Sequence, residues 1–201
     1  MKKEKIINYY YIVFPVLLQS ALFFLSKLIQ REPYNITTEF DKSIPYVPFF
    51  ILFYVFWYAL LFLAPIIIIK FDNKTIKNYF TTYIMCSITS TIIYVTFPTI
   101  IVRQTNLSNN FFDTIVKFIY SVDTPAVNCF PSFHVILCLL WIRFICLNKN
   151  INKSLRCILF IINICIILST LFIKQHVLID LLGSVVVIIL VEIIKKLLKR
   201  K

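Results

Sequence analysis

Long apolar runs separated by short polar stretches dominate this chain. Six of these runs approach the ~20 residues that a helix needs to cross a hydrocarbon layer roughly 30 Å thick, namely residues 6–29, 46–69, 79–102, 132–147, 157–173 and 176–194. A lone strand in lipid would leave its backbone groups unpaired, so we expect helices. The pattern therefore predicts an all-α integral membrane bundle of six transmembrane helices.

The composition points to lipid rather than water as the surroundings of the chain. Of the 201 residues, 60% are hydrophobic and one is a glycine, which is more apolar surface than a single soluble core could bury. No internal repeat, long linker or low-complexity tract divides the chain. We therefore expect residues 1–201 to form one six-helix transmembrane domain.

The net charge of +12 is unevenly spread over the connections between the runs. Basic residues gather before the first run, after the second, between the fourth and fifth, and at the end: Lys2, Lys3, Lys5, Lys70, Lys74, Lys77, Lys149, Lys153, Arg156, Lys195, Lys196, Lys199, Arg200 and Lys201. The other connections hold Arg31, Lys42, Arg103, Lys117 and Lys174. The positive-inside rule then predicts a multi-pass protein, expected in the cell membrane, with both termini cytoplasmic. Charges at span ends report orientation, and no nucleic-acid partner is expected.

The chain has two histidines, and each is expected at the outer end of a span beside other polar groups. Asp180 follows His176 by four residues, so on a helix the carboxylate lies one turn away on the same face. Such a carboxylate can fix the imidazole and leave its other nitrogen as a lone pair, as a nucleophile or general base requires. The alternative is a buried polar contact that holds helices together.

The second histidine belongs to the stretch Pro131, Ser132, Phe133, His134. Pro131 suits the first turn of a helix and Ser132 suits its cap, so free backbone amides should face the outer surface. A helix start of this kind can bind an anion such as phosphate. A purely structural hydrogen bond is the alternative for His134.

The longest connection, residues 103–130, contains apolar residues at helical spacing: Phe111, Phe112, Ile115, Val116 and Ile119. This spacing predicts a short helix lying in the membrane interface. Such a helix could be structural, or it could be a lid over a gap that admits lipid. Gly183, the single glycine, is expected to let another helix approach.

Neither cysteines nor carboxylates suggest a metal site. The six cysteines form no Cys-x-x-Cys pair, and all but Cys129 fall in predicted spans, so packing is their expected role. The carboxylates are too scattered to hold magnesium.

The residues Pro131-Ser132-Phe133-His134, then Ser169 and His176-x-x-x-Asp180, resemble the second and third motifs of the type 2 phosphatidic acid phosphatase superfamily. The first motif is matched by Arg103, while Thr96 stands where that family has a lysine and Gln104 where it has a proline. The resemblance covers roughly the second half of the chain. It implies a six-helix bundle with an outward site.

The resemblance also implies a role for each of these residues. His176 would be the nucleophile that forms a phosphohistidine, Asp180 would hold its ring, and His134 would be the general acid. Arg103, Ser132 and nearby backbone amides would bind the phosphate. No metal and no cofactor are implied.

At two positions of the expected site this chain departs from the family pattern, so that the site lacks one basic residue and one small residue. Thr170 stands where the family has an arginine, and Phe133 where it has a glycine. This pattern looks closer to the branch of inositol phosphorylceramide synthase-like phosphotransferases. We expect Lys174 to supply the missing charge, the alternative being an anchor at the interface or a contact to anionic lipid headgroups.

The expected function is a lipid phosphatase with an extracytoplasmic site and a lipid phosphate or diphosphate as substrate. Phosphatidic acid, phosphatidylglycerol phosphate and a polyprenyl diphosphate all fit that description. A lipid phosphotransferase of the inositol phosphorylceramide synthase type is the alternative enzyme. A non-catalytic relative that binds or moves lipids is the alternative from another class. The oligomeric state is left open.

Overall fold

The structure is a computed structural model that describes residues 2–29 and 32–199, with side chains in the first helix described from Tyr9 onward. Within these residues there are eight α-helices, three short 3₁₀ or π elements and two short strands. In chain order they are α1 (Lys2–Leu28), β1 (Tyr34–Asn35), α2 (Glu39–Ser43), η1 (Pro48–Phe50), α3 (Ile51–Asp72), η2 (Asn73–Thr75), α4 (Ile76–Thr96), β2 (Thr99–Ile100), α5 (Phe111–Val122), α6 (Phe133–Trp141), the π-helix η3 (Ile142–Cys146), α7 (Lys153–Phe172) and α8 (Leu178–Leu198).

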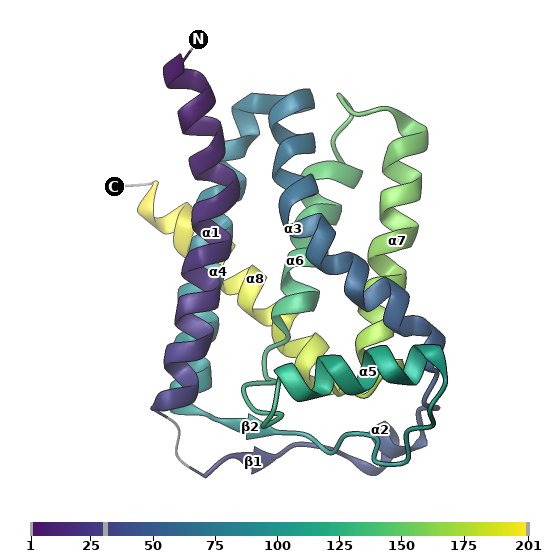
Figure 1. Ribbon diagram of the computed structural model, residues 1–201. Helices are drawn as coiled ribbons and strands as arrows, with labels where there is room; N and C mark the ends of the chain where they lie inside the picture. The colour runs from purple at the N-terminus through teal and green to yellow at the C-terminus, as the bar shows by residue number, and fades with distance from the viewer. Residues whose placement is uncertain (1, 30–31, 200–201) are drawn as a thin grey trace.

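The long helices form a bundle, and α2, α5, β1 and β2 lie together at one of its ends (Figure 1). Helix α5 lies across that end, beside β1, β2 and α2, while α1 starts at the opposite end. The α3–α4 and α6–α7 connections, which carry many of the basic residues, also lie at the end away from α5. This separation agrees with the charge pattern, and the side that faces the cytoplasm stays a prediction. Arg31, Arg200 and Lys201 and the side chains of Lys2, Lys3 and Lys5 lie outside the described residues.

Three helical stretches of the described chain are long and apolar enough to cross a membrane. They are Tyr9–Leu28, Pro48–Thr96 and Lys153–Phe172, and the second of them contains both α3 and α4. The apolar stretch Phe133–Cys146 is shorter, and α8 carries charged side chains within its length. Membrane association is thus supported, whereas six spans and one domain over residues 1–201 stay predictions.

The outward faces of the bundle are apolar, as lipid contact requires. Phe24 on α1 is 60% exposed, Ile161 on α7 is 61% exposed and Val186 on α8 is 62% exposed. Exposing such apolar faces to water would cost free energy, whereas the lipid chains of a bilayer cover them. The interior is closed by large side chains such as Trp141, whose indole Nε1 donates to the Tyr79 hydroxyl at 3.0 Å.

Two of the predicted span boundaries differ from the helix ends in the structure for local reasons. The third run was expected to stay helical to residue 102, but α4 ends at Thr96, because Pro98 disfavours helical geometry in the residue before it. The chain then forms β2, which pairs in parallel with β1. The sixth run was expected to be helical from His176, but α8 begins at Leu178.

Helix α5 confirms the short helix expected in the long connection. Asn110 caps it by accepting a hydrogen bond from the Asp113 backbone, and Val116 is fully buried against the bundle. Phe111 and Phe118 are exposed, which suits a helix in the interface. The hydroxyl of Tyr46, which precedes α3, donates to the Asp113 carboxylate at 2.5 Å and holds α5 in place.

Gly183 leaves room for the aromatic ring of Phe130, while the expected close approach of another helix stays a prediction. A Cβ atom at this position would lie 2.3 Å from Cε2 and 2.6 Å from Cζ of Phe130. The ring therefore occupies the space that any other residue would fill. Phe130 lies just before α6, so this contact helps to set the start of α6 against α8.

Candidate active site

The two histidines lie side by side and are joined to Asp180. Nε2 of His176 is 3.4 Å from Nδ1 of His134, and Nδ1 of His176 is 3.0 Å from the Asp180 carboxylate. Asp180 is completely buried, and its second oxygen, Oδ1, has no hydrogen-bond partner among the described residues. The structure thus brings together the three residues expected to carry the chemistry.

His176 is placed by a tight turn, not by a helical face. The Thr170 carbonyl accepts hydrogen bonds from the backbone amides of Gln175 and His176, both at 2.9 Å. Lys174 takes a positive φ of 53° to make this turn, a conformation that costs energy for a residue with a side chain. The Asp180 carboxylate also accepts the Val177 amide at 3.0 Å, which caps the start of α8. The expected contact between His176 and Asp180 is therefore present, but the expectation that both residues lie on one helix was wrong.

His134 sits in an aromatic cage at the start of α6. Its ring centroid lies 4.6 Å from that of Tyr54 and 4.2 Å from that of Trp57, both on α3. The indole Nε1 of Trp57 donates to the His134 carbonyl at 3.2 Å. Nε2 of His134 is buried and has no hydrogen-bond partner in the described part of the chain. The cage fixes the ring with Nδ1 directed at His176.

Ser132 caps α6 as expected, accepting the Val135 amide at 3.4 Å. Its backbone joins α6 to α8, because its amide donates to the Asp180 carbonyl at 3.2 Å and its carbonyl accepts from the Ser184 hydroxyl at 2.9 Å. Ser132 is completely buried and is not among the residues that line the two cavities described below. A phosphate contact from its hydroxyl stays a prediction.

Arg103 lies near the histidine pair, but its guanidinium is occupied by protein groups. It forms an ion pair with Asp123 at 2.5 Å and donates to the Gln175 side chain at 2.5 Å. It also lies 4.7 Å over the Tyr120 ring. Asp123 in turn pairs with Lys27 of α1 at 2.9 Å. Asp123 and Gln175 were not identified from the sequence, although Gln175 directly precedes His176.

Lys174 is bound to α2 instead of facing open space. Its ammonium donates to the carbonyls of Asp41 at 2.7 Å and Ile44 at 2.5 Å. Burial lowers the pKa of this ammonium, and the charge of Asp41 offsets part of that effect. The expected phosphate contact of Lys174 stays untested.

Asp41 fastens α2 to the turn that carries His176. One carboxylate oxygen accepts the Leu178 amide at 2.8 Å, and the other accepts the amide and hydroxyl of Thr38. Burial raises the pKa of the Asp41 carboxyl, but these hydrogen bonds and the Lys174 charge outweigh it, so the pKa is lowered. Nothing in the sequence pattern singled out Asp41, since its partners Leu178 and Lys174 lie more than 130 residues away.

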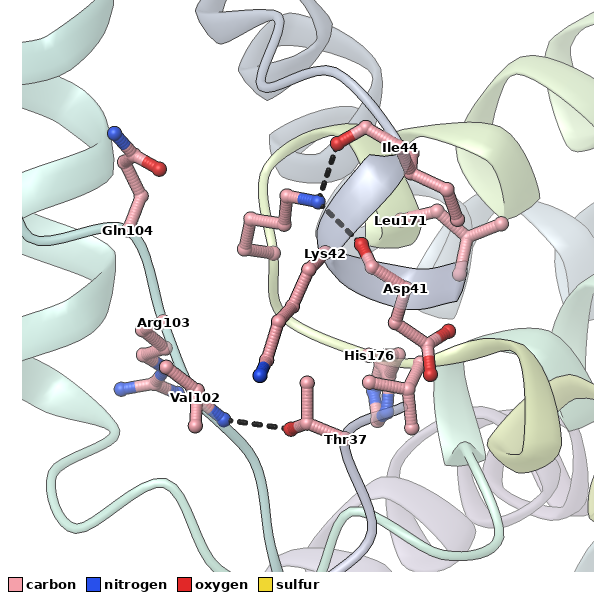
Figure 2. Close-up of a pocket in the computed structure, with 11 residues that line it drawn as sticks. Thr37, Asp41, Lys42, Ile44, Val102, Arg103, Gln104, Leu171 and His176 are labelled. Carbon is pink, nitrogen blue, oxygen red and sulfur yellow. Dashed lines mark hydrogen bonds between the residues drawn. The ribbon is translucent and has the colours of Figure 1, made fainter. Parts of the chain in front are cut away.

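His176 lines two cavities of different character. The first, shown in Figure 2, has a volume of about 190 Å³ and a wall that includes the polar or charged residues Thr37, Asp41, Lys42, Arg103, Gln104 and Lys174. The second has a volume of about 220 Å³ and also reaches His134, with an aromatic wall of Phe23, Phe24, Tyr54, Trp57, Tyr58, Tyr94 and Phe133. His176 therefore stands where a polar compartment meets an apolar one.

The two departures from the family pattern are both buried. Thr170 is completely buried, and its hydroxyl donates to the Ile167 carbonyl at 2.8 Å. Phe133 packs against Tyr83 with ring centroids 5.6 Å apart. Ser169, from the third motif, is buried and donates to the Ile166 carbonyl at 2.6 Å. In the described residues, no group of three or more His, Cys, Asp or Glu side chains could hold a metal ion.

Comparison with known proteins supports the family resemblance. A family model described as the PAP2 superfamily matches residues 37–194, a range that contains the histidine pair, Asp180, Arg103 and α2. Searches among curated proteins and among solved structures gave no match. The matched range covers most of the chain, so this protein belongs to the PAP2 superfamily, the type 2 phosphatidic acid phosphatase superfamily.

Proposed function

We propose that this chain is an integral membrane lipid phosphatase that hydrolyses a lipid phosphate or diphosphate at the outer face of the cell membrane. The reaction passes through a phosphohistidine on His176. The observation that carries the proposal is the order Asp180, His176, His134, with contacts of 3.0 and 3.4 Å. Membership of a superfamily of phosphatase-type enzymes supports it.

In the first step, His176 attacks the phosphorus atom. The Asp180 carboxylate accepts a hydrogen bond from Nδ1–H of His176, which keeps the proton on Nδ1 and leaves Nε2 with a free lone pair. As the bond from Nε2 to phosphorus forms, the bond from phosphorus to the lipid oxygen breaks. His134 donates a proton to that oxygen, and the lipid alcohol leaves.

In the second step, water replaces the lipid. His134, now neutral, accepts a proton from the attacking water, and the new phosphorus–oxygen bond displaces Nε2 of His176. Phosphate is released, and both histidines return to their starting states. Positioning and charge stabilisation account for the rate. No metal or cofactor takes part.

The two cavities suggest how a lipid phosphate would lie. The aromatic cavity reaches both histidines from the side of α1 and α3, so it suits the apolar chain of the substrate. The polar cavity, with Arg103 in its wall, suits the phosphate oxygens. The amides at the start of α6, behind Ser132, would add hydrogen bonds to the same group.

A lipid phosphotransferase is the second candidate, and the polar cavity is the observation that favours it. This cavity opens directly on His176, so an alcohol bound there could take the place of water in the second step. The product would then be a new phosphodiester instead of free phosphate. A non-catalytic lipid-binding relative would give neither product.

A single assay separates these candidates. Purified protein in detergent is offered a panel of lipid phosphates and diphosphates, and both free phosphate and new phosphodiesters are measured for wild type and for His176→Ala. Free phosphate from wild type and none from His176→Ala is the expected result. A phosphodiester that forms only with an added alcohol would identify the transferase. Identical results for wild type and His176→Ala would refute a phosphohistidine.

A further inference from the structure

Three basic side chains line the polar cavity beside His176, and two of them are held by fixed partners. Arg103 is bound to Asp123 and Gln175, and Lys174 is bound to two carbonyls of the chain around α2. Either one would have to give up these hydrogen bonds to bind a phosphate fully. The third basic residue of the cavity wall is Lys42.

Lys42 is held much more weakly. Its ion-pair partner within the described chain is Glu39, three residues earlier on α2, at 2.6 Å. The two side chains are 56% and 87% exposed, so water screens the pair and it contributes little to stability. Figure 2 shows the Lys42 side chain extending into the space between Arg103 and Thr37. Its ammonium can therefore change partners at low cost.

The backbone that carries Lys42 is nevertheless well fixed. Thr38 and Asp41 form a reciprocal capping box at the start of α2. The carboxylate of Asp41, only 5% exposed, holds the Leu178 amide just beyond His176, and Lys174 holds the other end of α2. Helix α2 is therefore attached to the turn of His176 from two sides. A weakly bound ammonium on a fixed backbone is a suitable arrangement for a ligand contact.

We propose that Lys42 is a phosphate-binding cation of this site, and that its ammonium passes from Glu39 to a phosphate oxygen when substrate binds. It would replace the charge missing at Thr96 and Thr170, where the resembling family has lysine and arginine. The inference rests on the proposed function, because it assigns the phosphate to His176. In this proposal, the role of α2 is to position Lys42 at the polar cavity.

Anion binding and turnover test this inference separately. Orthovanadate and inorganic phosphate are the probes, and their binding to purified protein in detergent is measured by the rise in thermal unfolding temperature. The variants are Lys42→Gln, Lys42→Arg and, as the matched control, Lys117→Gln. Lys117 is also an exposed lysine at this end of the bundle, where it bonds to the Asn109 side chain at 2.7 Å.

Lys42→Gln should weaken orthovanadate binding about tenfold and raise KM for a lipid phosphate by a similar factor, as expected for one charge-assisted hydrogen bond. Lys117→Gln should stay within twofold of wild type, and Lys42→Arg should keep part of the affinity. Glu39→Gln, which removes the competing carboxylate, should leave anion binding unchanged or tighter.

Each possible result supports or overturns the inference. Equal anion binding by Lys42→Gln and Lys117→Gln would overturn it, even if His176→Ala is inactive and the proposed function stands. A wild type that orthovanadate and phosphate do not stabilise would also overturn it. Loss of anion binding in Lys42→Gln, in a protein that turns over no lipid phosphate, would support the anion contact while the proposed function fails.

Discussion

Replacing Asp180 by asparagine tests the centre of the proposed mechanism. The asparagine has nearly the same size, and its carbonyl can still accept the hydrogen bonds from His176 and the Val177 amide, both 3.0 Å long in the structure. What disappears is the negative charge at a completely buried position. The change should therefore leave the fold intact and weaken the support that His176 receives when it becomes positive.

The size of the effect follows from the type of interaction that is lost. A hydrogen bond to a charged group contributes about 1.5–3 kcal/mol and a neutral one about 0.5–1.5 kcal/mol, so loss of the charge costs about 1–1.5 kcal/mol. Each 1.36 kcal/mol in the barrier changes the rate about tenfold. Asp180→Asn should therefore lower kcat by about 5- to 13-fold. KM should change little, because Asp180 contacts His176 and not the substrate.

The assay compares kcat, KM and thermal unfolding of Asp180→Asn with those of Asp113→Asn. Asp113 is a good control, because it is 4% exposed, accepts hydrogen bonds from Tyr46, Ser108 and Asn110, and lines neither of the two cavities at the histidines. Asp113→Asn should lower stability with little effect on kcat. If Asp180→Asn keeps kcat within threefold of wild type, or loses no more activity than the control, the reasoning is refuted.

Three other predictions concern the reaction, the packing and the membrane topology. His176→Ala should abolish turnover, His134→Ala should reduce it strongly, and a chelator should leave the wild type active. Phosphate release measures each of these three effects, and activity in His176→Ala would contradict the mechanism. Gly183→Ala should cost about 1–3 kcal/mol in unfolding free energy, because its Cβ would lie 2.3 Å from the Phe130 ring; Phe130→Leu should restore part of this loss, and an unchanged unfolding temperature would speak against it. A cysteine placed at Asn110 should react with an impermeant thiol reagent on intact cells, while one in the α6–α7 connection should react only after the membrane is opened. If instead the α6–α7 cysteine reacts on intact cells and the Asn110 cysteine does not, the predicted topology is wrong.

Much of the local structure could be predicted from the sequence, because it depends on neighbours along the chain. Apolar runs give the long helices, and Ser132 caps α6 as its position indicates. The periodic apolar residues of the long connection form α5. The four-residue spacing of His176 and Asp180 also placed them in contact, since both lie within one short turn and helix start.

Some local predictions failed where a neighbouring segment competed with the helix. The third span was extended through the apolar residues after Thr96, but Pro98 and the pairing of β2 with β1 end the helix earlier. The sixth span was predicted to start at His176. The Thr170 carbonyl, however, accepts hydrogen bonds from the amides of Gln175 and His176, and the helix begins after this turn. Apolar character alone does not distinguish a helix from a buried turn or strand.

Only the tertiary structure decided which groups surround the histidines. The approach of His134 to His176 and the aromatic cage from α3 join segments far apart in sequence, and the ion pair of Arg103 with Asp123 closes the connection that contains α5. Such contacts depend on how helices pack against each other, which a single sequence does not encode in any local pattern. The sequence determined most of the helices and indicated which residues are expected to carry the chemistry. The packing determined that Lys174 holds α2 and that Lys42 faces the cavity, because only the fold brings α2 to the turn of His176.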